Sequence, residues 1–178
     1  QGGHSGMDII KGLGNANKLM NRILYHASEN LDIHVSEING GGLRNAIPRE
    51  SEAVICVDDF QKKALLAELE QAWDAIKTEF ESLEPKLNLE IKELDEIPEK
   101  VMKEEDQETL LKAIYALHNG VYRMSPEIDG LVETSNNVAK IEVHKGNISV
   151  CCLTRSSVES SKDDIANQLR AAFELAGF

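Results

Sequence analysis

Residues 136–153, NNVAKIEVHKGNISVCCL, predict a β-hairpin that turns at Lys145 to Asn147. Apolar and polar side chains alternate along this stretch, as they do in strands that bury one face. Two antiparallel strands with one apolar face need a second layer to cover that face. The hairpin therefore constrains the rest of the chain, which must supply helices that each carry an apolar stripe.

The spacing of apolar residues predicts four such helices. They cover residues 14–30, 65–83, 110–118 and 165–176. The second helix must end before Pro85, because the residue before a proline disfavours helical backbone. Ser161 and Asp164 predict a capping box at the start of the last helix, and Gly177 predicts its C-terminal cap.

Alternating patterns predict further strands over residues 31–35, 52–58 and 87–94. Helices on one face of a mainly antiparallel sheet give an α+β fold, a two-layer sandwich. An acidic stretch with a proline suits an exposed connector. The sequence therefore predicts a first α/β unit at residues 1–94, a connector at 95–106 and a second α/β unit at 107–178.

Composition excludes several classes of partner. The chain has 19 Lys and Arg against 31 Asp and Glu, a net charge of -12, which opposes binding to nucleic acid or to an anionic membrane. No apolar run is long enough to span a bilayer, and no signal peptide is evident. Cys56, Cys151 and Cys152 form no CxxC pair, so neither a disulfide framework nor a zinc ribbon is expected. A cytoplasmic location is the simplest expectation.

Three residues are candidates for binding or chemistry. His4 lies among glycines that let a backbone approach another chain or a ligand, although such a stretch is more often a turn before a helix. Asn45 follows three glycines and suits either an Asx-turn or a contact with a ligand. Arg155 comes at the end of a predicted strand, where a guanidinium suits a carboxylate ligand or a surface ion pair.

Four segments, GGHSGMDIIKGLGNANKLMNRIL, GGGLRNAIPRE, GLVETSNNVAKI and LTRSS, resemble in order and separation the lid domain of the aminoacyl-histidine dipeptidases, or Xaa-His dipeptidases. This branch belongs to the two-zinc peptidases that also include carnosinase. The resemblance spans nearly the whole chain. It implies a ferredoxin-like lid domain, partly duplicated, that is inserted in a separate catalytic domain.

The resemblance also implies roles for the candidates. His4 would stabilise the oxyanion, in its own subunit or across a homodimer, while Asn45 would contact the backbone of a dipeptide substrate. Arg155 would bind the substrate's terminal carboxylate. The two zinc ions would be held by the catalytic domain, whose ligand motifs have no counterpart in these 178 residues. The lid by itself is therefore expected to bind no metal and to be inactive.

A second class of function stays open from the sequence. A small acidic α+β domain could be a non-enzymatic dimerisation or regulatory module, because a fold does not fix a function. A substrate-facing lid requires His4, Asn45 and Arg155 to converge on one surface. A module without a substrate site has no such requirement.

Overall fold

The computed structural model describes residues 2–178 and has the α+β fold expected from the sequence. Its elements, in chain order, are β1 (Gly3–His4), η1 (Ile9–Lys11), α1 (Ala16–Asn30), β2 (His34–Gly40), β3 (Ala46–Ile47), β4 (Ser51–Cys56), η2 (Asp59–Gln61), α2 (Lys62–Phe80), α3 (Glu104–Ala116), β5 (Gly120–Met124), β6 (Val132–His144), β7 (Asn147–Ser156) and α4 (Glu159–Leu175). Among residues 2–178, no helix has the length and apolar content needed to cross a membrane.

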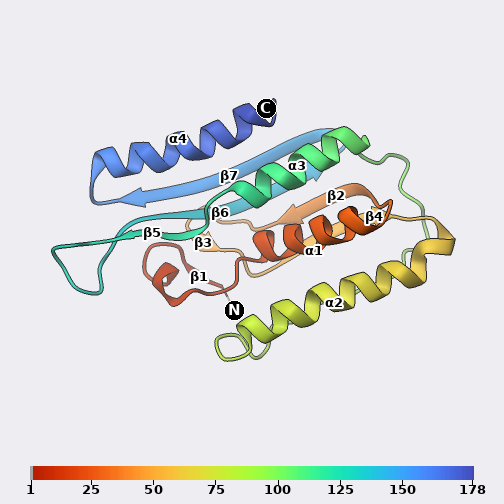
Figure 1. Cartoon of the computed structure of the whole chain (residues 1–178), viewed down its shortest axis with the longest axis horizontal. Helices are drawn as coiled ribbons and strands as arrows, with labels where there is room; N and C mark the ends of the chain where they lie inside the picture. Colours follow the sequence, from red (N-terminus) through yellow and green to blue (C-terminus); the bar gives the residue numbers. More distant parts are fainter. Residues whose placement is uncertain (1) are drawn as a thin grey trace.

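Five strands form one antiparallel sheet that is organised around β6 (Figure 1). Along one edge of β6, β5 pairs with its first part and β2 pairs with its last part, and β4 extends the sheet beyond β2. Strand β7 pairs with the other edge along most of its length. The two predicted units thus contribute strands to the same sheet. The division of the chain into units at 1–94 and 107–178 stays a prediction.

The predicted hairpin is confirmed as β6 and β7. His144 pairs with Asn147, and the two residues between them, Lys145 and Gly146, have φ angles of 51° and 80°. A two-residue turn with two positive φ angles is the type I′ turn that matches the twist of the strands. The glycine and the short polar stretch therefore fix the register of the sheet's longest pair of strands.

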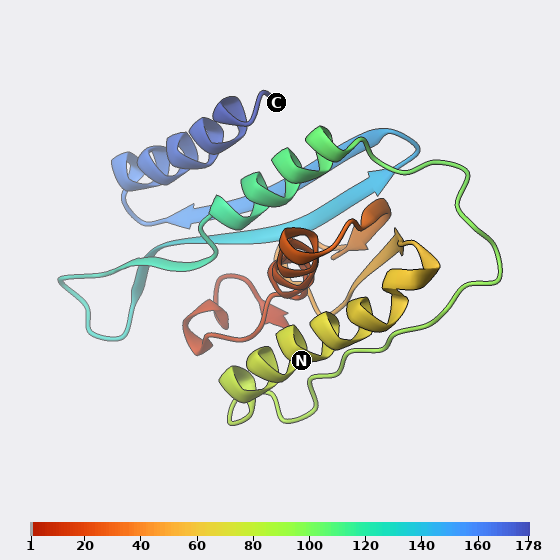
Figure 2. The same ribbon diagram turned by 45° about the vertical axis from the view of Figure 1, so that its right-hand side comes forward.

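Helices α1, α3 and α4 cover one face of the sheet, and α2 packs against α1 (Figures 1 and 2). The buried apolar residues form two clusters, and the helices contribute to both through their predicted apolar stripes. The larger one joins the sheet to the three helices and contains Leu24, Val35, Ile38, Leu110, Leu111, Ile114, Leu117, Val138, Ile141, Val143, Ile165 and Leu169. The smaller one joins α1 and α2 and contains Ile23, Ala27, Ile33, Leu65, Leu69, Ala72 and Ile76.

Three local expectations were wrong. Residues 87–94 form no strand, because Leu87 and Leu89 pack against the α1–α2 cluster and the segment finds no ladder partner. The strand expected at 31–35 is shifted and begins at His34, since Ile33 is buried in the same cluster.

The capping box is also absent. The N-cap of α4 is Val158, and the Ser161 hydroxyl instead bonds the Thr134 hydroxyl at 2.8 Å. Asp164 accepts a hydrogen bond from the Tyr122 hydroxyl at 2.9 Å. At the other end Gly177 is confirmed as the cap, with a φ of 79° and the Phe178 amide bonded to the Phe173 carbonyl at 3.0 Å. Helix α4 begins at Glu159, six residues before the first residue of the predicted range 165–176.

One lysine links α1 to the end of α3. The Lys18 ammonium donates to the carbonyl oxygens of Ile114, Tyr115 and Leu117 at 2.6, 2.9 and 2.9 Å. These carbonyls lie at the last turn of α3, where a helix leaves its acceptors without partners of its own. Lys18 therefore acts as a C-terminal cap supplied by another helix.

We expect Lys18→Met to lower the free energy of unfolding by about 2 kcal/mol, because methionine keeps the apolar stem but leaves the three carbonyls without their donor. Urea denaturation followed by circular dichroism measures this change. Lys63→Met, a substitution at an exposed position of α2, is the matched control and should change the free energy little.

The pH dependence of the free energy of unfolding provides a second test of the role of Lys18. Burial lowers its pKa from 10.5 to about 8. Between these values the unfolded chain binds more protons than the folded chain, so the contribution of Lys18 to stability rises with pH. The stability difference between the wild type and Lys18→Met should therefore widen from pH 8 to pH 10.5. A constant difference would mean that Lys18 titrates as an exposed amine.

Candidate functional site

The N-terminal glycines form a tight turn that pairs with the loop carrying Asn45. His4 lies opposite Ala46 in the small β1–β3 ladder, and the Ser5 amide donates to the Asn45 carbonyl at 2.8 Å. A Cβ atom on Gly3 would lie 2.8 Å from the Cβ atom of Asp8. This glycine is thus required where the chain folds back on itself, and the turn places His4 beside Asn45 along the backbone.

The imidazole of His4 is held in one orientation by two backbone amides. Its Nδ1 atom accepts hydrogen bonds from the amides of Gly6 at 3.1 Å and Met7 at 3.2 Å. A backbone amide can only donate, so Nδ1 carries no proton in this arrangement. The neutral ring must therefore carry its proton on Nε2, which leaves an N–H donor on the side of the ring away from the turn.

A carboxylate fixes the backbone of the same residue. The His4 amide donates to Asp8 Oδ2 at 2.8 Å, and Lys11 lies 2.7 Å from Asp8 Oδ1. The hydrogen bond from Lys11, followed by the one from the His4 amide, lowers the pKa of Asp8. Asp8 therefore stays ionised and continues to bind the His4 amide at any pH near neutrality.

Arg155 comes from a distant part of the chain to the same turn. It lies on β7 opposite Ser135 and is exposed. A Cβ atom on Gly6 would lie 3.1 Å from Cε1 of His4 and 3.5 Å from Cδ of Arg155. Gly6 therefore lies between the two side chains, and its lack of a side chain permits both to approach.

Asn45 is exposed in a loop that is pressed against β6. Gly41 has a φ of 73°, and a Cβ atom there would lie 2.0 Å from the Ala139 carbonyl oxygen. Only glycine fits this close approach. The loop then returns through Ala46, so that Asn45 adjoins the turn that carries His4.

The structure thus brings the three candidate residues together. The His4 turn contacts the Asn45 loop through the Ser5 hydrogen bond and the Arg155 side chain through Gly6. The contacts involve the backbone of Asn45 and the stem of the Arg155 side chain, so the three residues adjoin the same turn. The three residues carry an imidazole N–H, a carboxamide and a guanidinium, and these groups are donors suited to a ligand rich in carbonyl and carboxylate oxygens.

Comparisons with known proteins identify the family. Residues 1–88 match the peptidase dimerisation domain family. The chain is 37% identical over 179 residues to the cytosol non-specific dipeptidase of Escherichia coli strain K12, covering 99% of this chain and 36% of the relative. It also matches the crystal structure of aminoacylhistidine dipeptidase from Vibrio alginolyticus with a TM-score of 0.91 and 37% identity, over 99% of this chain and 36% of that one. Residues 1–88 of this chain belong to the peptidase dimerisation domain family.

The expected resemblance to a dipeptidase lid is thereby confirmed. The chain spans little more than a third of the length of the two dipeptidases, with 36% of each covered. These 178 residues therefore correspond to the dimerisation domain of peptidases of this family. The activity, substrates and partners of a whole enzyme are a separate matter.

The sequence reasoning missed a group of hydrogen-bonded asparagines around this site, most of which are buried. Asn15 donates to Asn119 Oδ1 at 2.8 Å and to Asn137 Oδ1 at 3.2 Å, and Asn137 donates to the Ala46 carbonyl at 2.8 Å. The available signal was the polar run ETSNN at residues 133–137, within a strand that otherwise enters the core. All five residues of this run are buried.

The other four histidines belong to different parts of the fold. His26 lies 3.2 Å from Glu68, His34 lies 3.5 Å from Asp32, and His144 lies 2.9 Å from Glu37. His118 packs edge-on against Tyr122. Among residues 2–178, no group of three or more His, Cys, Asp or Glu side chains is arranged to hold a metal ion.

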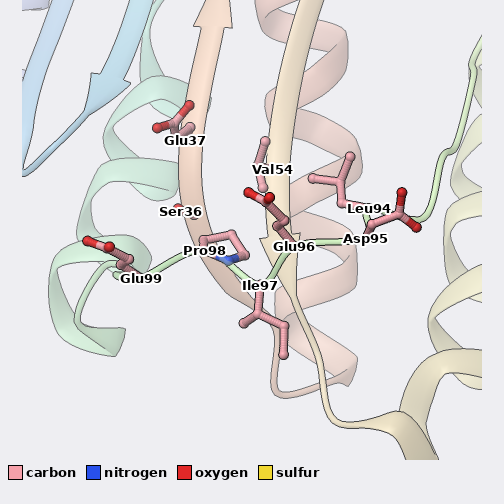
Figure 3. Close-up of a pocket in the computed structure, with 9 residues that line it drawn as sticks. All are labelled: Ser36, Glu37, Val54, Leu94, Asp95, Glu96, Ile97, Pro98 and Glu99. Carbon is pink, nitrogen blue, oxygen red and sulfur yellow. The ribbon is translucent and has the colours of Figure 1, made fainter.

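A hollow of about 560 Å³ lies elsewhere, where residues 94–99 cross β2 and β4 (Figure 3). Four of its nine lining residues are acidic, namely Glu37, Asp95, Glu96 and Glu99. Its negative charge opposes binding of a carboxylate substrate. The three candidate residues are not among those that line it.

The tautomer of His4 is directly testable. We expect nitrogen NMR of the labelled chain to show an unprotonated Nδ1 and a protonated Nε2 at neutral pH, because two backbone amides occupy Nδ1. Gly6→Ala should change this pattern, since the new methyl group would contact the ring at 3.1 Å. Gly42→Ala is the control, because a Cβ atom at Gly42 meets no atom within 4 Å. A protonated Nδ1 in the wild type would contradict the arrangement.

Proposed function

We propose that this chain is the lid and dimerisation domain of a metal-dependent dipeptidase that hydrolyses Xaa-His dipeptides, including carnosine-like ones. The observation that supports this most strongly is the His4 imidazole, whose Nδ1 is bonded to two amides so that Nε2–H is free to donate. The name of the structural relative, aminoacylhistidine dipeptidase, supports this substrate class.

His4 acts on the scissile carbonyl of the dipeptide. Peptide hydrolysis develops negative charge on this oxygen, and a preorganised donor at that position contributes about 3 to 4 kcal/mol of stabilisation to the transition state. The Gly6 and Met7 amides keep the ring oriented before substrate arrives, so little reorganisation is needed. The donor acts in its own subunit or across a homodimer.

Asn45 and Arg155 bind other parts of the same substrate. The Asn45 carboxamide can both donate to and accept from the substrate's backbone. The Arg155 guanidinium forms a paired hydrogen bond with the terminal carboxylate of a dipeptide. The two contacts together account for a preference for short substrates that end near the scissile bond.

The metal belongs to another part of the enzyme. Residues 2–178 lack a ligand set for zinc, and a catalytic zinc site needs about three protein ligands. We therefore assign two zinc ions to residues outside this chain and no step of the reaction to a metal bound here. The active enzyme includes a separate catalytic domain and acts in the cytoplasm, where the relative named cytosol dipeptidase is found.

Two substitutions in the full-length polypeptide test the roles. We expect His4→Ala to lower kcat by about 100-fold with little change in KM, because it removes a contact made in the transition state. Arg155→Ala should raise KM strongly, and more for dipeptides with a free carboxylate than for their C-terminal amides.

Thermal midpoints measured beside the kinetics are the control for these variants. If the chain is a non-enzymatic module, or if His4 and Arg155 are only scaffold, the variants will lose stability while the folded protein keeps its kinetics. Equal losses on acid and amide substrates would contradict the role given to Arg155.

We also propose that the chain forms a homodimer through the free edge of β7. This strand pairs with β6 on one side, and its ten residues offer an unpaired row of backbone groups on the other. Such an edge readily pairs with a second copy across a two-fold axis.

Light scattering of the 178-residue chain is therefore expected to give a mass approaching twice 19.7 kDa at high concentration. A lysine at an edge discourages pairing, so Cys151→Lys on β7 should weaken the dimer. Glu52→Lys on the opposite edge strand, β4, is the matched control. A wild-type monomer at high concentration, or equal weakening by both variants, would contradict pairing through β7.

A further inference from the structure

Asn137 lies where β6 meets the loop that carries Asn45. Its side chain is 1% exposed, and its Nδ2 atom donates to the carbonyl oxygens of Ala46 at 2.8 Å and Arg44 at 3.5 Å. These two carbonyls belong to the residues on either side of Asn45. One buried amide therefore holds the loop immediately before and immediately after the exposed asparagine.

The other end of the same carboxamide is also fixed. Asn137 Oδ1 accepts from Asn15 Nδ2 at 3.2 Å. Asn15 in turn donates to Asn119 Oδ1 at 2.8 Å, and its own oxygen accepts from the amides of Asn17 and Lys18 at the start of α1. With its oxygen held by Asn15, Asn137 can only present its NH₂ group to the loop.

The effect of this contact extends to His4. The carbonyl of Asn45 accepts the Ser5 hydrogen bond, and Ala46 pairs with His4 in the β1–β3 ladder. A shift of residues 44–46 would therefore move the backbone of His4 as well. The loop itself makes few other interactions, because residues 42–45 are exposed.

We infer that Asn137 is a positioning residue for the substrate site, which sets the place of Asn45 and, through the β1–β3 ladder, of His4. The part of this inference that concerns activity rests on the proposed function. Displacing a binding group by about 1 Å can cost about 100-fold in rate, so a buried residue that fixes two such groups affects catalysis without contacting substrate.

The neighbouring Asn136 provides a matched control. It is 0% exposed, donates from Nδ2 to the His118 carbonyl at 2.7 Å and accepts from the Thr154 hydroxyl at 3.1 Å. Its burial and its bonding resemble those of Asn137, but its partners lie away from residues 44–46. Asn137→Asp and Asn136→Asp each replace one NH₂ donor with an oxygen that repels the facing carbonyl, at nearly constant size.

The first measurement is hydrogen exchange of the Ser5 amide, which donates to Asn45. At matched global stability, we expect Asn137→Asp to speed this exchange by about tenfold and Asn136→Asp to leave it unchanged, since only the first loosens the Asn45 loop. Equal acceleration of Ser5 exchange in both variants, or no acceleration in either variant, overturns the inference.

The second measurement is the kinetics of the full-length polypeptide on an Xaa-His dipeptide. Asn137→Asp is expected to lower kcat/KM by about 10- to 100-fold, and Asn136→Asp by less than about threefold. Selective loss with Asn137→Asp supports the inference. If Ser5 exchange accelerates selectively while kcat/KM is unchanged, Asn137 still positions the loop, and it is the proposed function of Asn45 and His4 that fails.

Discussion

The amide and carbonyl groups of Val138 lie in the middle of the sheet and need hydrogen-bond partners. The arrangement of the site follows from how these partners are supplied. Strand β5 pairs with β6 as far as Asn136, and β2 begins to pair at Ile141. Val138 lies in the gap between them and is fully buried. Its amide donates to Asn119 Oδ1 at 3.0 Å, and its carbonyl accepts from Asn15 and Asn17, both at 3.1 Å. Asparagine carboxamides therefore replace a missing strand, because a buried peptide group cannot be left without partners.

This gap explains why β6 has two kinds of surroundings. Beyond the gap, Ile141 and Val143 enter the apolar core with α1 and α3. Before it, residues 133–137 are polar and buried, and Asn137 among them holds the loop that carries Asn45. The second half of β6 therefore packs in the apolar core, while its first half positions the candidate site. A shift in the register of β6 would disturb both at once.

The sequence predicted the parts of the fold that follow from local periodicity. The helical stripes and the β6–β7 hairpin were found because their apolar spacing and turn residues are local signals. Residues 87–94 were mistaken for a strand because alternation alone cannot show whether a ladder partner exists. Strands β1 and β3 were missed because two residues each leave no periodic pattern, and they form only when the N-terminal turn meets the Asn45 loop.

The candidate site was predictable in part. His4, Asn45 and Arg155 were identified from motifs, but their proximity depends on contacts between residues 40 or more positions apart, such as Ser5 with Asn45 and Gly6 with Arg155. The asparagine group was not identified because buried amides have no periodic signal. Their partners are backbone groups that only the folded chain brings together.

The uneven distribution of charge is compatible with the anionic ligand that we propose for Arg155, although the domain as a whole is acidic. Residues 51–110 contain 18 of the 31 acidic residues and 7 of the 19 Lys and Arg, so this segment carries -11 of the net charge of -12. It forms β4, α2, the connector and most of α3, and it includes three of the four acidic residues around the hollow in Figure 3. The segments that form the site, residues 1–50 and 111–178, are close to neutral. Because salt screens exposed charges beyond about 8 Å, a ligand at Arg155 responds to that guanidinium and its near neighbours more than to the distant excess of carboxylates. The net charge of the domain therefore limits which macromolecules approach it, while the local charge decides which small ligand it can hold.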